Sequence, residues 1–350
     1  MSEKVNIAIL TEGSQKIGLG HITRCISLYQ AFWSKGISPK LIVNGDKSFE
    51  SLMSGLNYET LDWTADDFEL RQLLENSDVA IVDSYRAAHD FYKTVSEIVR
   101  IPVYIDDYKR LDYPRGIVIN VALNASDLDY PQKEGIRYLL GRQYVLLRKE
   151  LWDVPIREER DQVESFLITF GGIDFGDMTI RTLGLLRENW PDSIKNVIVG
   201  PAFQNIEDIK MAADKGTRLF FSPLERKVKD IMIGSDIAIS AAGQTLYELA
   251  RIGVPTVAVT VAENQTNNVK AWLKTECILH AGWSTDPNIL ERIGENIHLL
   301  KLLQERQKIS INAKALIDGL GAMRVAEEII GALEAAPSSV SQSLPKRNST

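Results

Sequence analysis

Glycine-rich turns followed by polar side chains occur twice in this sequence, and both could hold a phosphate group. The first turn, Gly18-Leu19-Gly20-His21, follows an apolar run at 5–10. The second, Ser240-Ala241-Ala242-Gly243-Gln244-Thr245, also follows an apolar run and has Glu248 one helical turn further on. Glycine lets the backbone approach a ligand closely, and the free N–H groups at the start of a helix attract anions. One such turn in each half indicates a cleft that holds a nucleotide diphosphate.

The first turn matches no complete phosphate-binding motif. It lacks the Gly-Lys-Ser/Thr of a Walker A loop, and Thr23 stands where a dinucleotide fingerprint has its third glycine. Spacing alone therefore leaves two alternatives open. The turn is either a phosphate loop, with Gly18 and Gly20 in contact with the ligand, or a plain loop.

His21 is the candidate general base. A helix N-terminus disfavours the imidazolium and so favours a neutral ring, although a histidine there can also simply cap its own helix. Asp83 and Tyr85 follow the apolar run at 79–82, and Asp107 follows the run at 103–105. These side chains would share one rim with His21, where they could orient sugar hydroxyls or tune the imidazole, or instead cap the next helices.

In the second half, Glu248 is the candidate ribose ligand, because a carboxylate there can accept hydrogen bonds from both ribose hydroxyls. Gln244 and Thr245 present donors at the same helix start, and Ser240 and Gly243 belong to the preceding turn. Gly171-Gly172 is either a second phosphate turn or a tight turn. The amides at 263–268, Gln265 and Asn268 among them, either bind the ligand or form an exposed helix start.

Short apolar runs alternate with amphipathic helical patterns along the chain. The helix at 21–33, for example, has apolar residues at i, i+3, i+4 and i+7. The predicted strands lie at 5–10, 39–43, 79–82 and 103–105, and then at 165–170, 197–199, 219–221, 237–240 and 256–259, with a helical stretch at about 287–333. This alternation predicts an α/β fold with two doubly wound, Rossmann-like domains that face each other across a cleft. We expect domains at 1–150 and 162–336, a linker at 151–161 and a disordered tail at 337–350.

Composition excludes several classes of function. A formal net charge of -7 argues against binding to nucleic acid or an anionic membrane surface. We expect no export signal and no integral membrane segment, because the first apolar run is short. The 2 cysteines are too few for a disulfide framework, so we expect a cytoplasmic protein. The histidines have no metal-ligand spacing, so we expect neither a metal nor a cofactor. The oligomeric state stays open.

Several ordered motifs together resemble a known family. The stretch from Ser240 to Glu248, then Gly253-Val254-Pro255 and 263–268, resembles the UDP-binding half of MurG-type GT-B glycosyltransferases. With the turn at 18–25, Asp83-Ser84-Tyr85, 105–107, 120–125 and 170–174, the chain resembles more closely the PseG-type UDP-sugar hydrolases of pseudaminic acid biosynthesis. The resemblance spans about 5–330. Ser84 and Arg86 depart from the neighbours expected for Tyr85 in that family.

The resemblance implies a GT-B fold and the release of UDP, by water and without a metal, from a UDP-linked 2,4-diacetamido-2,4,6-trideoxy sugar. It implies His21 as the base, with Tyr85 and Asp83 beside it. The substrate-binding residues it implies are Gly18, Gly20, Arg24, Asp107, Asn124, Gly171, Gly172, Ser240, Gly243, Gln244, Thr245, Glu248, Gln265 and Asn268. Two alternatives stay open: a GT-B glycosyltransferase that uses the same kind of donor, and a nucleotide-sugar binding protein without turnover.

Overall fold

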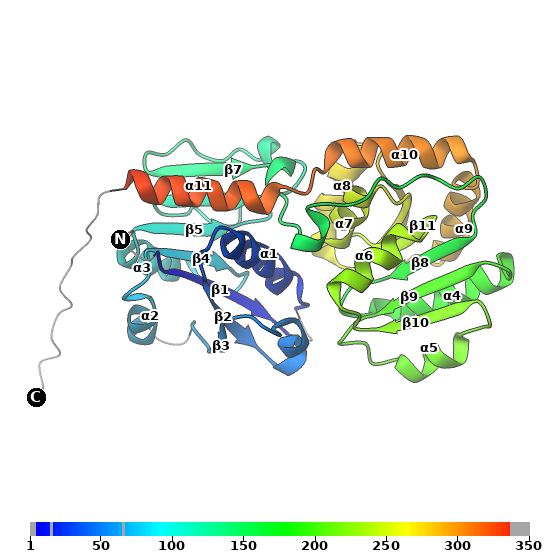
Figure 1. Ribbon diagram of the computed structural model, residues 1–350, viewed down its shortest axis with the longest axis horizontal. Coiled ribbons are helices and arrows are strands. Elements are labelled where there is room, and N and C mark those ends of the chain that lie inside the picture. Colours follow the sequence, from blue (N-terminus) through cyan, green and yellow to red (C-terminus); the bar gives the residue numbers. More distant parts are fainter. Residues whose placement is uncertain (1–4, 15–16, 65–66, 337–350) are drawn as a thin grey trace, which may run out of the picture.

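The computed structural model describes residues 5–14, 17–64 and 67–336. The tail that we expect to be disordered, at 337–350, lies outside these residues. Two parallel β-sheets lie side by side along the long axis of the molecule, with helices packed around each (Figure 1). The structure thus confirms the predicted pair of doubly wound sheets.

The first sheet has seven parallel strands in the order β3-β2-β1-β4-β5-β6-β7. Its strands are β1 (Ile7–Gly13), β2 (Lys40–Gly45), β3 (Tyr58–Thr60), β4 (Val79–Asp83), β5 (Ile101–Ile105), β6 (Gly116–Asn120) and β7 (Ile136–Leu140). The helices between them are α1 (Gly20–Ser34), α2 (Asp67–Leu74) and α3 (His89–Ile98). Every residue of β1 and β4 is buried, as expected for central strands covered on both faces.

The second sheet has six parallel strands in the order β10-β9-β8-β11-β12-β13. Its strands are β8 (Ser165–Thr169), β9 (Ile194–Val199), β10 (Thr217–Phe221), β11 (Ile237–Ala241), β12 (Thr256–Thr260) and β13 (Leu279–Trp283). Its helices are α4 (Met178–Asn189), α5 (Ile206–Ala212), α6 (Glu225–Ile233), α7 (Thr245–Ile252), α8 (Thr266–Leu273), α9 (Ile289–Leu299) and α10 (Leu303–Leu316). Short 3-10 helices lie at Lys47–Leu52, Ala125–Asp127, Arg142–Tyr144, Lys149–Leu151, Phe175–Asp177 and Glu263–Gln265.

The last helix, α11 (Gly321–Ala335), packs on the first sheet's side of the molecule, although we expected 162–336 to form the second domain. It lies beside α1 and β5 (Figure 1). Its apolar face, which includes Val325, Ile329 and Leu333, is buried there. Lys35, the residue after α1, also pairs with Glu327 at 2.8 Å. The chain therefore crosses between the two sheets twice.

The segment at 151–161 is ordered by buried charged groups. Arg157 donates to the backbone oxygens of Ser235 and Gly253 and pairs with the buried Glu159. Arg306 of α10 is fully buried and donates to the backbone oxygens of Arg160 and Asp161. Buried arginines therefore fix the stretch that we expected to be a linker to the elements around the second sheet.

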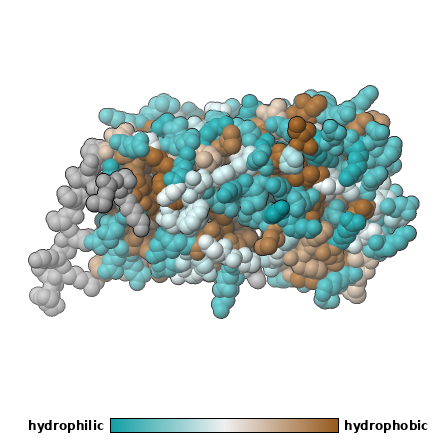
Figure 2. All heavy atoms as spheres, in the orientation of Figure 1, coloured by the Kyte–Doolittle hydropathy of each residue, from teal (hydrophilic) through white to brown (hydrophobic). Residues whose placement is uncertain are grey.

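The surface offers no dominant apolar face in the view of Figure 1. Figure 2 shows a largely hydrophilic surface with hydrophobic side chains in separate areas. Among the described residues, no helix is long and apolar enough to span a membrane.

Replacing Arg306 with leucine should destabilise the fold, because four backbone oxygens lose a buried charged donor: those of Arg160, Asp161, Leu300 and Lys301. We expect the free energy of unfolding to fall by about 3 kcal/mol. Urea denaturation measures it. Lys308→Ala is the matched control on α10, because Lys308 pairs with Glu276 on the surface and its loss should leave the midpoint unchanged. Equal midpoints for Arg306→Leu and the wild type would contradict this role.

Candidate active site

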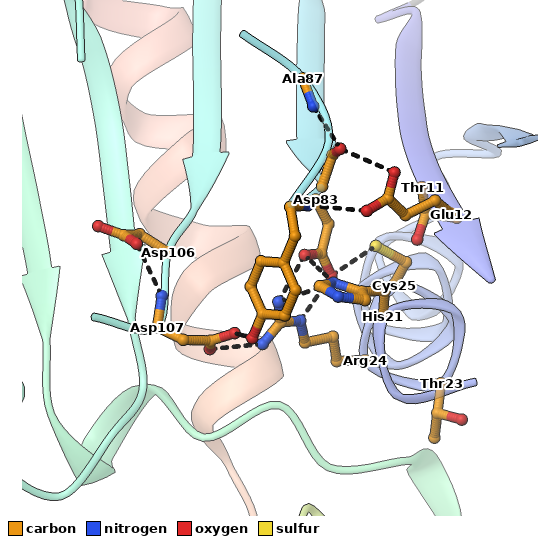
Figure 3. Close-up of polar contacts among 12 residues, drawn as sticks. Thr11, Glu12, His21, Thr23, Arg24, Cys25, Asp83, Ala87, Asp106 and Asp107 are labelled. Atoms are coloured by element: carbon orange, nitrogen blue, oxygen red, sulfur yellow. Dashed lines mark hydrogen bonds and ion pairs between the residues drawn. The ribbon is translucent and has the colours of Figure 1, made fainter. Parts of the chain in front are cut away.

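Asp83, the last residue of β4, lies at the centre of a buried polar cluster (Figure 3). Its Oδ1 lies 2.6 Å from Nδ1 of His21. Arg24 donates to both of its oxygens, with Nε and Nη2 each at 2.5 Å. Asp83 is 0% exposed, His21 6% and Arg24 7%. Because His21 and Arg24 are one turn apart on α1, the bidentate ion pair of Arg24 and the contact of His21 together fix the start of the helix to the end of β4.

The charge state of Asp83 decides where the His21 proton lies. Burial alone would raise the pKa of Asp83, but the Arg24 guanidinium and the His21 ring outweigh it and hold the pKa well below its usual range. An ionised carboxylate only accepts hydrogen bonds, so the tautomer of His21 with a proton on Nδ1 donates to Asp83, while Nη2 of Arg24 lies 3.0 Å from the same Nδ1. In that tautomer Nε2 has the free lone pair. This is the arrangement of a general base oriented by a carboxylate.

Asp107 and Tyr85 complete the cluster. Nη1 of Arg24 lies 2.6 Å from Oδ1 of Asp107, and the Tyr85 hydroxyl donates to Oδ2 of the same carboxylate. Burial and the negative charge of Asp107 raise the pKa of Tyr85 far above its usual value, so the phenol keeps its proton. The Tyr85 and His21 rings pack edge to face in a T-shaped arrangement, with centroids 4.4 Å apart and planes at 85°. The tyrosine therefore restricts the orientation of the imidazole.

Glu12, which the sequence analysis did not select, supports Tyr85 from β1. The buried Glu12 carboxylate accepts hydrogen bonds from Ser84 Oγ and from the Tyr85 backbone N–H, both at 2.8 Å. Ser84 Oγ in turn accepts from the backbone N–H groups of Arg86 and Ala87. The turn after β4 is therefore held by one carboxylate. The signal in the sequence was a single acidic residue inside an apolar strand.

The turn at Gly18–Gly20 lies next to the turn at Gly171–Gly172, which follows β8. Gly18 and Gly171 have φ angles of +83° and +85°, a backbone region that favours glycine. A Cβ atom on Gly172 would lie 3.9 Å from the Leu19 side chain, so the two turns are neighbours. Around Gly20, a Cβ atom would meet no atom within 4 Å.

The residues predicted around α7 lie at its start, and several are engaged with the protein itself. Gln244 Nε2 donates to the Leu146 backbone oxygen at 3.1 Å, and Glu248 pairs with Arg148 at 2.7 Å. The Ser240 hydroxyl is fully buried and donates to the Ala241 backbone oxygen. Thr245 is the first residue of the helix. Sequence reasoning missed Arg148, because nothing in its local sequence marks it.

Two of the predicted amides, Gln265 and Asn268, lie beside the turn before α7. Asn268 Nδ2 donates to the Ala242 backbone oxygen, and its Oδ1 accepts from the Tyr247 hydroxyl at 2.8 Å. Gln265 Oε1 accepts from the Val261 N–H, and its Nε2 lies 3.6 Å from where a Cβ of Gly243 would be. Burial and the negative charge of Asp107 raise the pKa of Tyr247. Sequence reasoning also missed Tyr247, whose ring packs on Trp272 in a T-shaped arrangement.

Asn124 lies in a different place from the rest of the predicted set. It lines a cavity of about 330 Å³ between the two halves, at the ends of β6 and β7. Arg142 from the first half and Lys274 from the second also line it. Within 5–14, 17–64 and 67–336, no group of three or more histidine, cysteine, aspartate and glutamate side chains is placed to hold a metal ion.

No family model matches the chain. It is 24% identical over 312 residues to an uncharacterised protein of Methanocaldococcus jannaschii, covering 85% of this chain and 64% of that protein. It is 26% identical over 271 residues to the pseudaminic acid cytidylyltransferase and UDP-2,4-diacetamido-2,4,6-trideoxy-beta-L-altropyranose hydrolase of Helicobacter pylori, covering 75% of this chain and 46% of that protein. The chain thus spans less than two thirds of the length of these two relatives.

The spore coat polysaccharide biosynthesis protein SpsG of Bacillus subtilis is 19% identical and matches over 92% of this chain and 96% of its own length. Among solved structures, MurG of Acinetobacter baumannii superposes with a TM-score of 0.67 at 13% identity, over 93% of this chain and 99% of that one. A glycotransferase of kitacinnamycin gives a TM-score of 0.62 at 14% identity, over 95% and 100%. These likenesses confirm the GT-B fold. The chain shares this fold and is similar, at 26% identity, to a protein whose name includes a UDP-sugar hydrolase.

Proposed function

We propose that the protein hydrolyses a UDP-linked 2,4-diacetamido-2,4,6-trideoxy sugar at its anomeric carbon, releasing UDP and the free sugar for the synthesis of pseudaminic-type acids. The observation that carries the proposal is the 2.6 Å contact between His21 Nδ1 and the Asp83 carboxylate at the start of a glycine-turn helix. A relative that combines a hydrolase of this kind with a cytidylyltransferase supports the choice of substrate.

The chemistry needs a base on one side of the anomeric carbon and a stabilised leaving group on the other. Nε2 of His21 takes a proton from water as the water oxygen bonds to the anomeric carbon. The bond from that carbon to the phosphate oxygen breaks, and its electron pair stays on UDP. The ionised Asp83 and Asp107 outnumber the single positive charge of Arg24. Their field favours the positive charge that builds up on the sugar ring.

The leaving group lies on the side of the second half in this proposal. The start of α1 and the neighbouring turn at Gly171–Gly172 would offer N–H donors to the diphosphate. Glu248, buried at the start of α7, would accept the ribose hydroxyls. Donors that meet the developing phosphate charge need no metal ion, and we propose a reaction that proceeds without one.

A GT-B glycosyltransferase is the second candidate. It is favoured by the structural likeness to MurG, whose fold the chain shares. The two functions differ in what attacks the anomeric carbon: water in a hydrolase, a hydroxyl of an acceptor in a transferase. A binding protein without turnover would release no UDP at all.

Purified protein incubated with the UDP-linked sugar should release UDP without any added acceptor. We expect one free sugar for each UDP, and an unchanged rate in excess EDTA. Chromatography of both products measures this. Dependence on an acceptor would favour the transferase, no release would favour the binding protein, and loss of the rate in EDTA would contradict the metal-free reaction.

His21→Asn should lower kcat by about 100-fold or more, the scale of positioned general-base catalysis, and leave UDP binding nearly intact. The depressed pKa of Asp83 keeps the carboxylate beside residue 21 ionised in the assay. Steady-state kinetics and calorimetry with UDP measure the two effects.

His89→Asn is the matched control for this experiment. His89 begins α3, its side chain is 53% exposed and it pairs with Asp90, so the substitution should leave the rate unchanged. Near-normal kcat in His21→Asn, with normal folding by circular dichroism, would reduce His21 to a structural role.

A further inference from the structure

We propose that Arg148 is a positioning residue that holds the Glu248 carboxylate for the nucleotide and ties its helix, α7, to the helix that carries His21. The inference rests on the proposed function, in which Glu248 binds the ribose. It concerns a residue outside both glycine turns and outside the cluster around Asp83.

The segment at 146–152, where the chain passes from the first sheet to the second, lies along one side of α7 and of the residue before it. Gln244, Glu248 and Arg251 are four and three residues apart, a spacing that places them on one side of a helix. Gln244 donates to the Leu146 backbone oxygen at 3.1 Å. Arg251 donates to the Leu151 oxygen at 3.0 Å and to the Trp152 oxygen at 2.8 Å. All three hydrogen bonds go to the backbone of the segment.

Between them, Glu248 contacts a side chain of the segment. Nη2 of Arg148 lies 2.7 Å from its Oε1, and Nη1 of Arg148 lies 3.4 Å from Oε1 of Glu225 on α6. The Glu248 side chain is 6% exposed and the Arg148 side chain 14%. Burial acts to lower the pKa of Arg148, but the two carboxylates outweigh it and raise the pKa, so the guanidinium stays charged.

The contacts continue from Glu225 to α1. Gln30 of α1 donates from Nε2 to Oε2 of Glu225 at 3.4 Å, and its Oε1 accepts from the Lys149 backbone N–H at 2.8 Å. The same helix carries His21 in its first turn. Glu248, Arg148, Glu225 and Gln30 therefore form one line of polar contacts from the proposed ribose ligand to the catalytic helix.

This arrangement has a chemical consequence for the carboxylate. A buried carboxylate without a cation is costly, so without Arg148 the Glu248 side chain would move out of its position toward solvent. That movement removes a charged acceptor for the ribose. Arg148 thus acts on the nucleotide through Glu248, without touching it.

The test is UDP binding by calorimetry on the full chain. Arg148→Met, which removes the charge and keeps much of the volume, should weaken UDP binding by about tenfold or more. It should also raise KM for the UDP-sugar more than it lowers kcat. Arg148→Lys keeps the charge but cannot contact Glu225 and Glu248 together. It should therefore lose less UDP affinity than Arg148→Met.

Arg251→Met is the matched control. It removes the hydrogen bonds from Arg251 to the backbone of the segment at 146–152 but leaves the pair between Arg148 and Glu248 in place. UDP binding should therefore stay within about twofold of the wild type. A loss of UDP affinity equal to that of Arg148→Met would mean that any contact between α7 and the segment matters equally, and it would overturn the proposal.

A double-mutant cycle isolates the positioning effect. In a Glu248→Gln background, the loss caused by Arg148→Met should disappear, because both act through one carboxylate. Full additivity would overturn the proposal, as would wild-type affinity in Arg148→Met. If Arg148→Met does not fold, Arg148→Lys takes its place in the cycle. Failure of the wild type to bind UDP would instead contradict the proposed function itself.

Discussion

The buried ion pair between Arg24 and Asp83 is the interaction on which the rest of the active site depends. Removing one partner of such a pair typically costs about 3–5 kcal/mol, because the other charge is left buried and unpaired. Asp83 ends a central strand and Arg24 lies on the helix that follows the first glycine turn. The pair therefore sets the position of His21, and through Asp107 that of Tyr85. Each side chain in the cluster is held by charge as well as by packing.

Two crossings of the chain tie the halves of the molecule together. The segment at 146–152 lies along α7, and α11 returns to pack on α1. In the proposed function, α7 has two tasks, because the helix whose start would bind the nucleotide also holds the segment between the sheets. Binding of the nucleotide and the relative placement of the halves would then depend on the same side chains.

The sequence allowed the two sheets, the glycine turns and the first-half cluster to be predicted, because central parallel strands are continuous apolar runs and their polar ends share one edge. It did not reveal β3, β6, β7 and β13. These strands lie at or beside a sheet edge, and β3, β7 and β13 are partly exposed, so they lack the continuous apolar run of a central strand. The positions of α11 and of Arg148 depend on contacts between distant segments, which no local pattern encodes.

The most direct test of the central claim is hydrolysis of the UDP-sugar in ¹⁸O-labelled water, followed by mass spectrometry of the UDP. Attack at the anomeric carbon, with His21 as the base, leaves the original oxygen on the phosphate. The account therefore predicts unlabelled UDP; the free sugar is less informative because its anomeric oxygen exchanges with water. Labelled UDP would show that water attacks phosphorus, and it would contradict the proposed role of His21 and of the cluster around Asp83.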